Sequence, residues 1–329
     1  MGPIASADLQ AALDALRAGE LVAFPTETVY GLGADARNPA AVRRIFAVKG
    51  RPANHPVIVH LQSLRELSGW VRSVPPAAER LAERFWPGPL TLVLPRSLQV
   101  DDCVTGGQDT VAVRVPAHPV AQQLLGAFGG GIAAPSANRY GRVSPTRAEH
   151  VREELGTAVT VVLDGGECPI GLESTIVAFQ DGRARLLRPG RITAGEIRAQ
   201  LGSLQIGADA ASPRVPGSTA AHYAPATALE IVPAAQLEAR SAALAQAGRR
   251  VAVLAQRAPQ SALPAVTWID ATALAQRYGH DLYAHLRALD KSGCERILVQ
   301  EVPQGDEWEA IRDRLHRAAV GAAAPGDTP

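Results

Sequence analysis

The chain has 329 residues, of which 47% are hydrophobic, and its 33 Lys and Arg nearly balance its 32 Asp and Glu. A chain of this length can form two domains and bury a substantial core. The net charge of +1 excludes a chain-wide basic field that would demand nucleic acid, although a local basic cleft stays possible. Three scattered cysteines without a CxxC pair argue against a structural zinc site and a disulfide framework.

The first residues lack the basic start and long apolar run of a signal peptide. No apolar stretch reaches the length that spans a membrane. We therefore expect a reduced, cytoplasmic protein with no membrane partner.

Helix and strand patterns alternate along the first 202 residues. Residues 6–19 open with a Ser/Asp cap signal, follow helical apolar spacing and end at Gly19, and residues 38–50 have Pro39 in the first turn and Gly50 just past the end. Residues 20–34 begin as one buried strand that breaks at Pro25 into a polar loop. Further strands are predicted at 55–61, 91–95, 110–116, 131–138, 159–166, 174–179 and 184–189, with helices at 119–128 and 147–155. Because several strands follow one another directly, we expect an open mixed sheet with packed helices and not a strictly alternating doubly wound sheet.

Residues 203–228 differ in amino-acid composition from the preceding part of the chain. They are rich in Gly, Pro, Ser and Ala without an apolar period, which is typical of an interdomain linker, yet they include the two rings of His222 and Tyr223. Beyond them, strands are predicted at 228–233, 250–256, 266–270 and 296–303, with helices at 234–248, up to about Ser292, and from 306. This pattern predicts a smaller, Rossmann-like α/β domain at 229–320 and a frayed tail at 321–329.

Lys49 and Arg51 are two cations in a loop broken by Gly and Pro, and Lys49 is one of only two lysines in the chain. Residues two apart in an extended loop point the same way, so both could neutralise one triphosphate. The alternative is a solvated helix C-terminus, where cations also suit the helix dipole, and spacing alone favours it.

Hydroxyl and carboxamide side chains gather in "PSANRYGRVSPT", which contributes Ser136, Asn138, Ser144 and Thr146. Such groups can bind phosphate oxygens or complete the ligand shell of Mg²⁺, whereas the alternative is a set of ordinary turns. No GxxxxGK[ST] sequence occurs, which excludes a P-loop.

Arg114 lies between two valines in an alternating strand and is the candidate to hold a ligand carboxylate. The alternative is an edge-strand arginine on the solvent face. His60 closes another strand, where a lone histidine is more often structural than catalytic. Glu27 could act as a base, although a loop carboxylate is more often simply solvated.

Seven segments resemble, in order and spacing, the YrdC-like domain of threonylcarbamoyl-AMP synthases over about residues 10–202. They are "FPTETVYGLG", "KGRPANHPVIVH", "WPGPLTLVL", "VAVRVPAHP", "APSANRYGRVSPT", "DGGECPIGLESTIV" and "LLRPG". "PGSTAAHYAP" and the residues after it resemble the linker and small C-terminal domain of the long form of that family. The resemblance implies domains at 1–202 and 229–320 joined by a linker at 203–228.

The resemblance also implies a reaction that joins L-threonine, bicarbonate or CO2, and ATP into threonylcarbamoyl-AMP and pyrophosphate. A separate transferase complex would then modify the adenosine beside the anticodon of tRNA. Such chemistry needs positioning and charge stabilisation more than a protein nucleophile, in a site that excludes water from the carbamate.

The family's functional residues carry over by motif. The residues implied to bind and neutralise the ATP phosphates, together with Mg²⁺ held mainly through ATP and by no direct protein ligand, are Lys49, Arg51, Ser136 and Asn138. Further implied nucleotide contacts are His55, Thr110, Ser144, Arg188 and Tyr223. The implied threonine pocket comprises Thr28, His60, Arg114, Ala134 and Ser174.

Two departures from the family pattern concern the nucleotide site. His55 stands where the family commonly has Asn, and Ser218, Thr219 and Ala220 replace the usual sequence after Pro-Gly in the linker. His222 and Tyr223 keep the family's pattern, so we expect the linker to cover the nucleotide site as a lid.

Two alternative functions can be weighed on the sequence. A tRNA or double-stranded RNA-binding module without its own catalysis fits poorly with 4% aromatic residues and near-zero charge. A hydrolase or carbamoyl-transfer maturation factor would typically carry further segments with paired cysteines, which this chain lacks.

Overall fold

The computed structural model describes residues 4–180 and 182–322, which fall into two compact units. The first unit runs to Tyr140 and resumes at Ser144–Ser218, and the second comprises Gly141–Val143 and the residues from Thr219 on. None of the described helices combines the length and the apolar character needed to cross a membrane.

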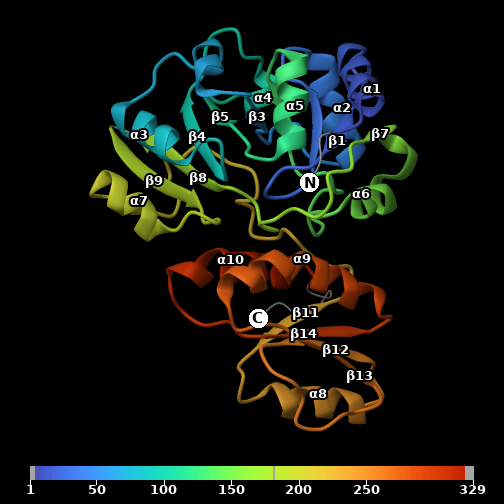
Figure 1. The fold of residues 1–329 in the computed structure, drawn as a ribbon. Helices are drawn as coiled ribbons and strands as arrows, with labels where there is room; N and C mark the ends of the chain where they lie inside the picture. The colour runs from blue at the N-terminus through green and yellow to red at the C-terminus, as the bar shows by residue number, and fades with distance from the viewer. Residues whose placement is uncertain (1–3, 181, 323–329) are drawn as a thin grey trace. The chain divides into compact units, whose positions relative to one another are not determined.

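A ten-stranded mixed sheet forms the first unit, in the order β10-β9-β8-β4-β5-β3-β6-β2-β1-β7 (Figure 1). Its strands are β1 (Val22–Phe24), β2 (Gly31–Asp35), β3 (Ile58–His60), β4 (Leu90–Pro95), β5 (Thr110–Arg114), β6 (Ile132–Ala133), β7 (Val161–Val162), β8 (Thr175–Gln180), β9 (Arg183–Arg188) and β10 (Gln205–Ile206). β5 pairs antiparallel with β4 and parallel with β3, so the predicted open mixed sheet is confirmed.

The helices of the first unit pack on this sheet. They are α1 (Ser6–Arg17), α2 (Pro39–Lys49), α3 (Pro76–Phe85), α4 (Asp102–Thr105), α5 (Pro119–Phe128), α6 (Ala148–Leu155) and α7 (Ala194–Leu201), with 3-10 turns η1 (Leu64–Gly69) and η2 (Gly156–Ala158). The cap of α1 is Ala5, which makes no side-chain bond, so Ser6 begins the helix without capping it. The short strand predicted to break at Pro25 is present as β1, but the loop predicted after it is wrong at its end, because Gly31–Asp35 form β2 and pair antiparallel with β1.

Helix α2 shows why its sequence places Lys49 where it does. The Asn38 side chain accepts hydrogen bonds from the N–H groups of Ala40 and Ala41, and Gly50 ends the helix in the left-handed region at φ 64°. Lys49 is therefore the last helical residue and is buried, not part of an extended loop as predicted.

The two faces of the sheet differ in character because side chains alternate along each strand. Val59 of β3 and Val113 of β5 face the main hydrophobic core, whereas Ile58 and Ala112 belong to a smaller cluster on the opposite face. That cluster also contains Val93, Ile176, Ala178, Leu187 and Val215. We call this opposite side the second face.

Part of the predicted linker is ordered against the first unit. β10 extends the sheet by pairing parallel with β9, and Val215 packs into the small cluster of the second face. Arg214 donates from its backbone N–H to Gln108 Oε1 at 2.7 Å and from Nη2 to the Gly106 carbonyl at 2.9 Å. Composition alone had predicted no regular structure here.

The second unit is a parallel four-stranded sheet in the order β11-β14-β12-β13, with α9 and α10 on one face and α8 on the other (Figure 1). Its strands are β11 (Leu229–Val232), β12 (Val251–Ala255), β13 (Val266–Asp270) and β14 (Arg296–Gln300). Its helices are α8 (Leu237–Gln246), α9 (Ala275–Lys291) and α10 (Asp306–Gly321). The predicted small α/β domain is thus present, while the predicted tail lies, from residue 323 on, outside the described residues.

Candidate active site

Polar side chains form a row across the second face of the large sheet. His60 of β3 is the register partner of Arg114 of β5, and Thr91 of β4 is the partner of Ile176, which in turn pairs with Arg188 of β9. His60, Thr91 and Arg114 each lie two residues from a member of the small apolar cluster, so they share its face. The fold therefore gathers three predicted site residues, His60, Arg114 and Arg188, along one line.

Arg114 is buried and makes contacts along its whole guanidinium. Nη2 lies 2.6 Å from Glu27 Oε1, Nη1 donates to Thr28 Oγ1 at 2.8 Å, and Nε donates to the Gly88 carbonyl at 3.2 Å. β5 is an interior strand between β4 and β3, so the alternative of a solvent-facing edge arginine is wrong. The expectation that Glu27 is simply solvated is also wrong, because Glu27 is buried in this ion pair.

Thr28 connects this arginine to the loop that follows β1. Its hydroxyl accepts from Arg114 and donates to Thr26 Oγ1 at 2.8 Å, while Thr26 in turn donates to the Val29 carbonyl at 2.7 Å. Since each hydroxyl has one proton, this direction is the one that satisfies all three contacts. The loop is thus held rigidly beside Arg114.

His60 is neutral in this environment. Burial, with a smaller contribution from the nearby Arg114 charge, lowers the pKa of His60 from 6.5 to about 3. Its ring meets Phe24 edge-on at a centroid distance of 6.0 Å. A neutral imidazole can donate and accept one hydrogen bond each, which suits recognition of an uncharged polar group.

Ser174 and Arg188 close the row at its other end. Ser174 Oγ lies 2.7 Å from Thr91 Oγ1 and accepts from Arg188 Nη2 at 3.0 Å. Arg188 also donates to the Ser174 carbonyl and, through Nη1, to the Pro216 carbonyl at 2.9 Å. Arg188 therefore ties Ser174 to the ordered part of the linker.

Lys49 anchors the loop that contains Ser136 and Asn138. Its ammonium donates to the Ser136 carbonyl at 2.6 Å and to the Asn138 carbonyl. Burial and the neighbouring Arg51 charge lower the pKa of Lys49 well below its usual value. The alternative of a solvated helix end is wrong for Lys49, although it does occupy the C-terminal turn of α2.

Arg51 and His55 meet Tyr140, a residue that the sequence did not single out. Arg51 donates to the Pro56 carbonyl at 2.8 Å, and its guanidinium lies 5.9 Å from the Tyr140 ring centroid. The Tyr140 hydroxyl lies 3.4 Å from His55 Nδ1, and burial followed by the Arg51 charge lowers the pKa of His55.

The remaining predicted residues of the first unit occupy varied surroundings. Ser144 Oγ donates to Glu173 Oε1 at 2.5 Å, with both residues buried. The Ala134 N–H donates to the Ile58 carbonyl at 2.9 Å. Thr110 begins β5 and is half-buried. Because Arg114 ends the same strand four residues later, the two residues lie about 13 Å apart along it.

Tyr223 belongs to the second unit, where it is buried. Its ring lies 5.9 Å from that of Tyr283 on α9 and 5.0 Å from the guanidinium of Arg314 on α10. Its backbone has φ 60°, in the left-handed region that a residue other than glycine seldom adopts. These contacts describe a packing residue of the second unit, and the predicted nucleotide contact of Tyr223 stays a prediction.

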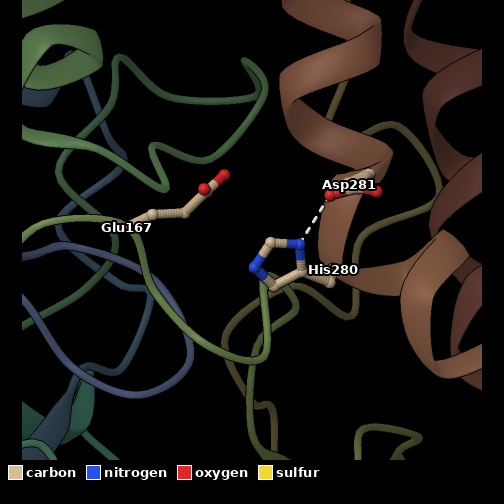
Figure 2. Close-up of side chains that lie close together, drawn as sticks. All are labelled: Glu167, His280 and Asp281. Atoms are coloured by element: carbon tan, nitrogen blue, oxygen red, sulfur yellow. Dashed lines mark hydrogen bonds and ion pairs between the residues drawn. The ribbon is translucent and has the colours of Figure 1, made fainter.

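Helix α9 also carries an acid–histidine pair, His280 and Asp281 (Figure 2). His280 Nδ1 lies 2.6 Å from Asp281 Oδ1, and Arg277 Nε lies 2.7 Å from Asp281 Oδ2. Asp281 thus has two partners on its own helix, and we assign this pair no catalytic role.

The sequence did not predict which residues form hydrogen bonds or ion pairs with several of the site residues. Glu27, Thr91, Tyr140 and Glu173 bond to predicted residues, but each partner is distant in sequence, as with the 87 positions between Glu27 and Arg114. Among these partners, the sequence contains a signal for Thr91 alone, because side chains alternate along a strand and "TLVLP" therefore puts the polar Thr91 on the same face as Val93.

Comparison with known proteins shows which family the chain is similar to. A family model described as "Telomere recombination" matches residues 14–190, and a model of the threonylcarbamoyl-AMP synthase C-terminal domain matches residues 192–320. A threonylcarbamoyl-AMP synthase of Pyrococcus abyssi is 40% identical over 315 residues, which cover 92% of each chain. The chain belongs to the threonylcarbamoyl-AMP synthase family. A Bacillus subtilis threonylcarbamoyl-AMP synthase is 39% identical and covers 93% of this chain and 91% of its own.

The likeness to this synthase family extends to the three-dimensional structure. The crystal structure of P. abyssi Sua5 complexed with L-threonine matches with a TM-score of 0.88 and 39% identity, over 95% of this chain and 94% of that chain. The predicted family, α/β fold and synthase activity are therefore confirmed, and the chain is an enzyme of the nucleotidyltransferase type. Family membership decides against the alternative of an RNA-binding module without its own catalysis.

Proposed function

We propose that the first unit forms threonylcarbamoyl-AMP from L-threonine, bicarbonate or CO2, and ATP, with release of pyrophosphate, between the polar row and the loop anchored by Lys49. The observation that carries this proposal is the buried Lys49 ammonium, whose hydrogen-bond partners are the neutral carbonyls of Ser136 and Asn138. An ammonium has three N–H groups, so one remains for a ligand, and no carboxylate among the described residues forms an ion pair with it. A phosphate is the ligand that such a cation suits best.

The chemistry requires little covalent help from the protein. The deprotonated amine of threonine adds to CO2 and loses a proton to give a carbamate, or it reacts with bicarbonate and releases water. A carbamate oxygen then attacks the α-phosphorus of ATP, and pyrophosphate carries away the bonding electron pair. The protein contributes alignment of the two substrates and stabilisation of the charge that develops on the phosphates.

The threonine pocket of this proposal lies at the Arg114 end of the row. Arg114 would bind the carboxylate, while the neutral His60 and the hydroxyls of Thr28 and Ser174 suit the amine and hydroxyl of threonine. The backbone around Ala134 would complete the pocket. A buried site of this kind rejects valine because its polar groups would lose their partner. That the relative P. abyssi Sua5 was crystallised with L-threonine supports threonine as the amino-acid substrate.

The ATP phosphates of this proposal are held by Lys49, Arg51, Ser136 and Asn138, and further nucleotide contacts are assigned to His55, Thr110, Ser144, Arg188 and Tyr223. Mg²⁺ in this proposal is held mainly through the ATP phosphates and water, with no direct protein ligand, and the neutral side-chain oxygens of Ser136 and Asn138 suit the surroundings of such an ion. Bound Mg²⁺ would offset negative charge on the departing pyrophosphate. The linker as a lid is part of the same proposal.

We also propose the cellular setting of the reaction. The product is an activated carbamoyl adenylate that water destroys, so it must pass to a transferase complex that modifies tRNA. The scarcity of cysteine pairs agrees with a cytoplasmic location. Direct contact between this chain and tRNA is not needed for the reaction.

A substrate-omission assay tests the proposed function. Purified protein is incubated with ATP, Mg²⁺, threonine and bicarbonate, each omitted in turn, while pyrophosphate is measured and the adenylate is detected by mass. We expect pyrophosphate only from the complete mixture. ATP turnover that does not need threonine or bicarbonate would contradict the proposal.

A matched pair of lysine variants tests the site within that assay. Lys49→Ala should lower threonine-dependent pyrophosphate release by about a hundredfold or more, because the phosphates lose a fixed point charge. Lys291→Ala removes the only other lysine, at the end of α9, and should leave the rate within about twofold of wild type. Equal rates for the two variants would show that Lys49 is not in the phosphate site.

A further inference from the structure

The buried ion pair between Glu27 and Arg114 has a consequence for substrate binding. We infer that Glu27 is a positioning residue, which orients Arg114 to present two N–H groups to the carboxylate of the amino-acid substrate. The inference rests on the proposed function, in which Arg114 binds that carboxylate.

Contacts to the side chain and to the backbone of Glu27 hold it in place. One carboxylate oxygen, Oε1, lies 2.6 Å from Arg114 Nη2, and the other, Oε2, accepts from the Ala117 N–H at 3.0 Å. The backbone carbonyl of Glu27 accepts from the Ile170 N–H at 2.9 Å. The side chains of Glu27 and Arg114 are only 8% and 4% exposed, so water does not screen their attraction.

The contacts of Arg114 within the protein determine which of its N–H groups remain available to bind a substrate carboxylate. A guanidinium has five N–H groups; Nε donates to Gly88 and Nη1 to Thr28, whereas Nη2 meets Glu27 Oε1 at 2.6 Å as an ion pair without a hydrogen bond. At least one N–H group therefore remains on each terminal nitrogen. An arginine can bind a carboxylate bidentately through one N–H group on each of its two terminal nitrogens.

Glu27 is the member of this set that fixes the guanidinium by charge. Gly88 and Thr28 supply neutral oxygens, whereas Glu27 supplies a carboxylate that also offsets the cost of burying the arginine. A glutamine at this position keeps the shape but turns either a weaker acceptor or an N–H toward Arg114. The orientation of the guanidinium would then be lost while the nucleotide site is untouched.

Substrate-specific kinetics of Glu27 variants test the inference. In the pyrophosphate-release assay, Glu27→Gln should raise the KM for threonine about tenfold or more while the KM for ATP stays within about twofold. Glu27→Asp, which keeps the charge, should recover part of that loss. A role in folding alone would lower thermal stability and the active fraction without separating the two KM values.

A double-mutant cycle shows whether Glu27 acts through Arg114. In an Arg114→Gln background, Glu27→Gln should cause less than about a twofold further rise in the KM for threonine, because the residue it orients is gone. Fully additive effects would overturn the inference, as would a threonine KM unchanged by Glu27→Gln in a folded variant. Glu20→Gln, in an exposed ion pair with Arg44 of the same unit, is the control and should change neither KM.

The outcomes separate this inference from the proposed function. If the wild-type protein releases no threonine-dependent pyrophosphate, the proposed function fails before any variant is compared. If it does and Arg114→Gln raises the threonine KM but Glu27→Gln does not, the function stands and the positioning role of Glu27 is wrong.

Discussion

The buried cations of the first unit differ in what surrounds their charge. Arg114 is paired with the Glu27 carboxylate, which offsets its positive charge. Arg114 can therefore bind a substrate carboxylate through the direction of its N–H groups more than through net charge. Lys49 instead donates to two neutral carbonyls, and burial together with the Arg51 charge lowers its pKa, which disfavours its charged form in the absence of an anion. A nearby phosphate would raise that pKa again, so ligand binding and protonation of Lys49 should support each other.

The identity of these residues could be predicted from the sequence better than their contacts. Arg114 stands between two valines, and that alternation marked it as a candidate ligand-binding residue while leaving a solvent-facing edge position open. Its partner Glu27 comes from a loop 87 residues earlier, and only the strand order of the folded sheet brings the two together. Long-range pairs of this kind leave no local pattern in a single sequence.

The depressed pKa of His60 predicts a contribution to acid sensitivity. The folded pKa is about 3 against an ordinary 6.5, so between these pH values the unfolded chain binds a proton that the folded chain does not. Stability should therefore fall as pH decreases through this window, by up to about 1.4 kcal/mol per pH unit from this residue. Denaturant unfolding between pH 4 and 7 measures the slope.

His60→Gln should flatten that slope, because glutamine does not titrate. The residual slope would come from other groups, including His55 and His118, whose pKa values burial also lowers. Parallel stability curves for wild type and His60→Gln would contradict the buried, neutral state assigned to His60.

At the scale of elements, the sequence located helices with clear boundary signals and missed the two strands that lack an apolar pattern of their own. Helix α2 follows Asn38 and Pro39 and ends at Gly50, and these local signals sufficed to predict it. β2 and β10 were missed, because a glycine-rich strand of five residues and a strand of two lack any apolar period. Their pairing with neighbours, not their own propensity, makes them strands.

The cap of α2 predicts a measurable share of local stability. Asn38→Ala removes the side-chain acceptor of the Ala40 and Ala41 N–H groups and should lower the free energy of unfolding by about 1 kcal/mol. Because α2 positions Lys49, the loss should be seen as faster amide exchange in this helix. Arg43→Ala on the exposed side of the same helix should change stability by less than about 0.5 kcal/mol, and an equal effect of the two would exclude capping as the cause.

At the scale of the whole molecule, the chain builds two sheets of different kinds, one mixed and one parallel. The apolar clusters that cover the mixed sheet come from the first unit, and the cluster around β12 and β14 comes from the second. The change in composition after residue 202 predicted that there are two parts. It did not predict that Gly141–Val143 would group with the second unit, because those three residues lie within a first-unit motif.

Separate cores predict that damage to one unit stays within it. Tyr223→Ala removes a buried ring that packs against Tyr283 and Arg314, and the resulting cavity should destabilise the second unit by about 3–5 kcal/mol. Hydrogen exchange should then accelerate at β12 and β14 while β4 and β5 keep their protection, because their core contains none of these rings. Val113→Ala, in the core of the first unit, should give the reverse pattern, and Tyr223→Phe, which keeps the ring, should cost less than about 1.5 kcal/mol. Equal acceleration of exchange in both sheets after Tyr223→Ala would mean that the two cores unfold as a single cooperative unit.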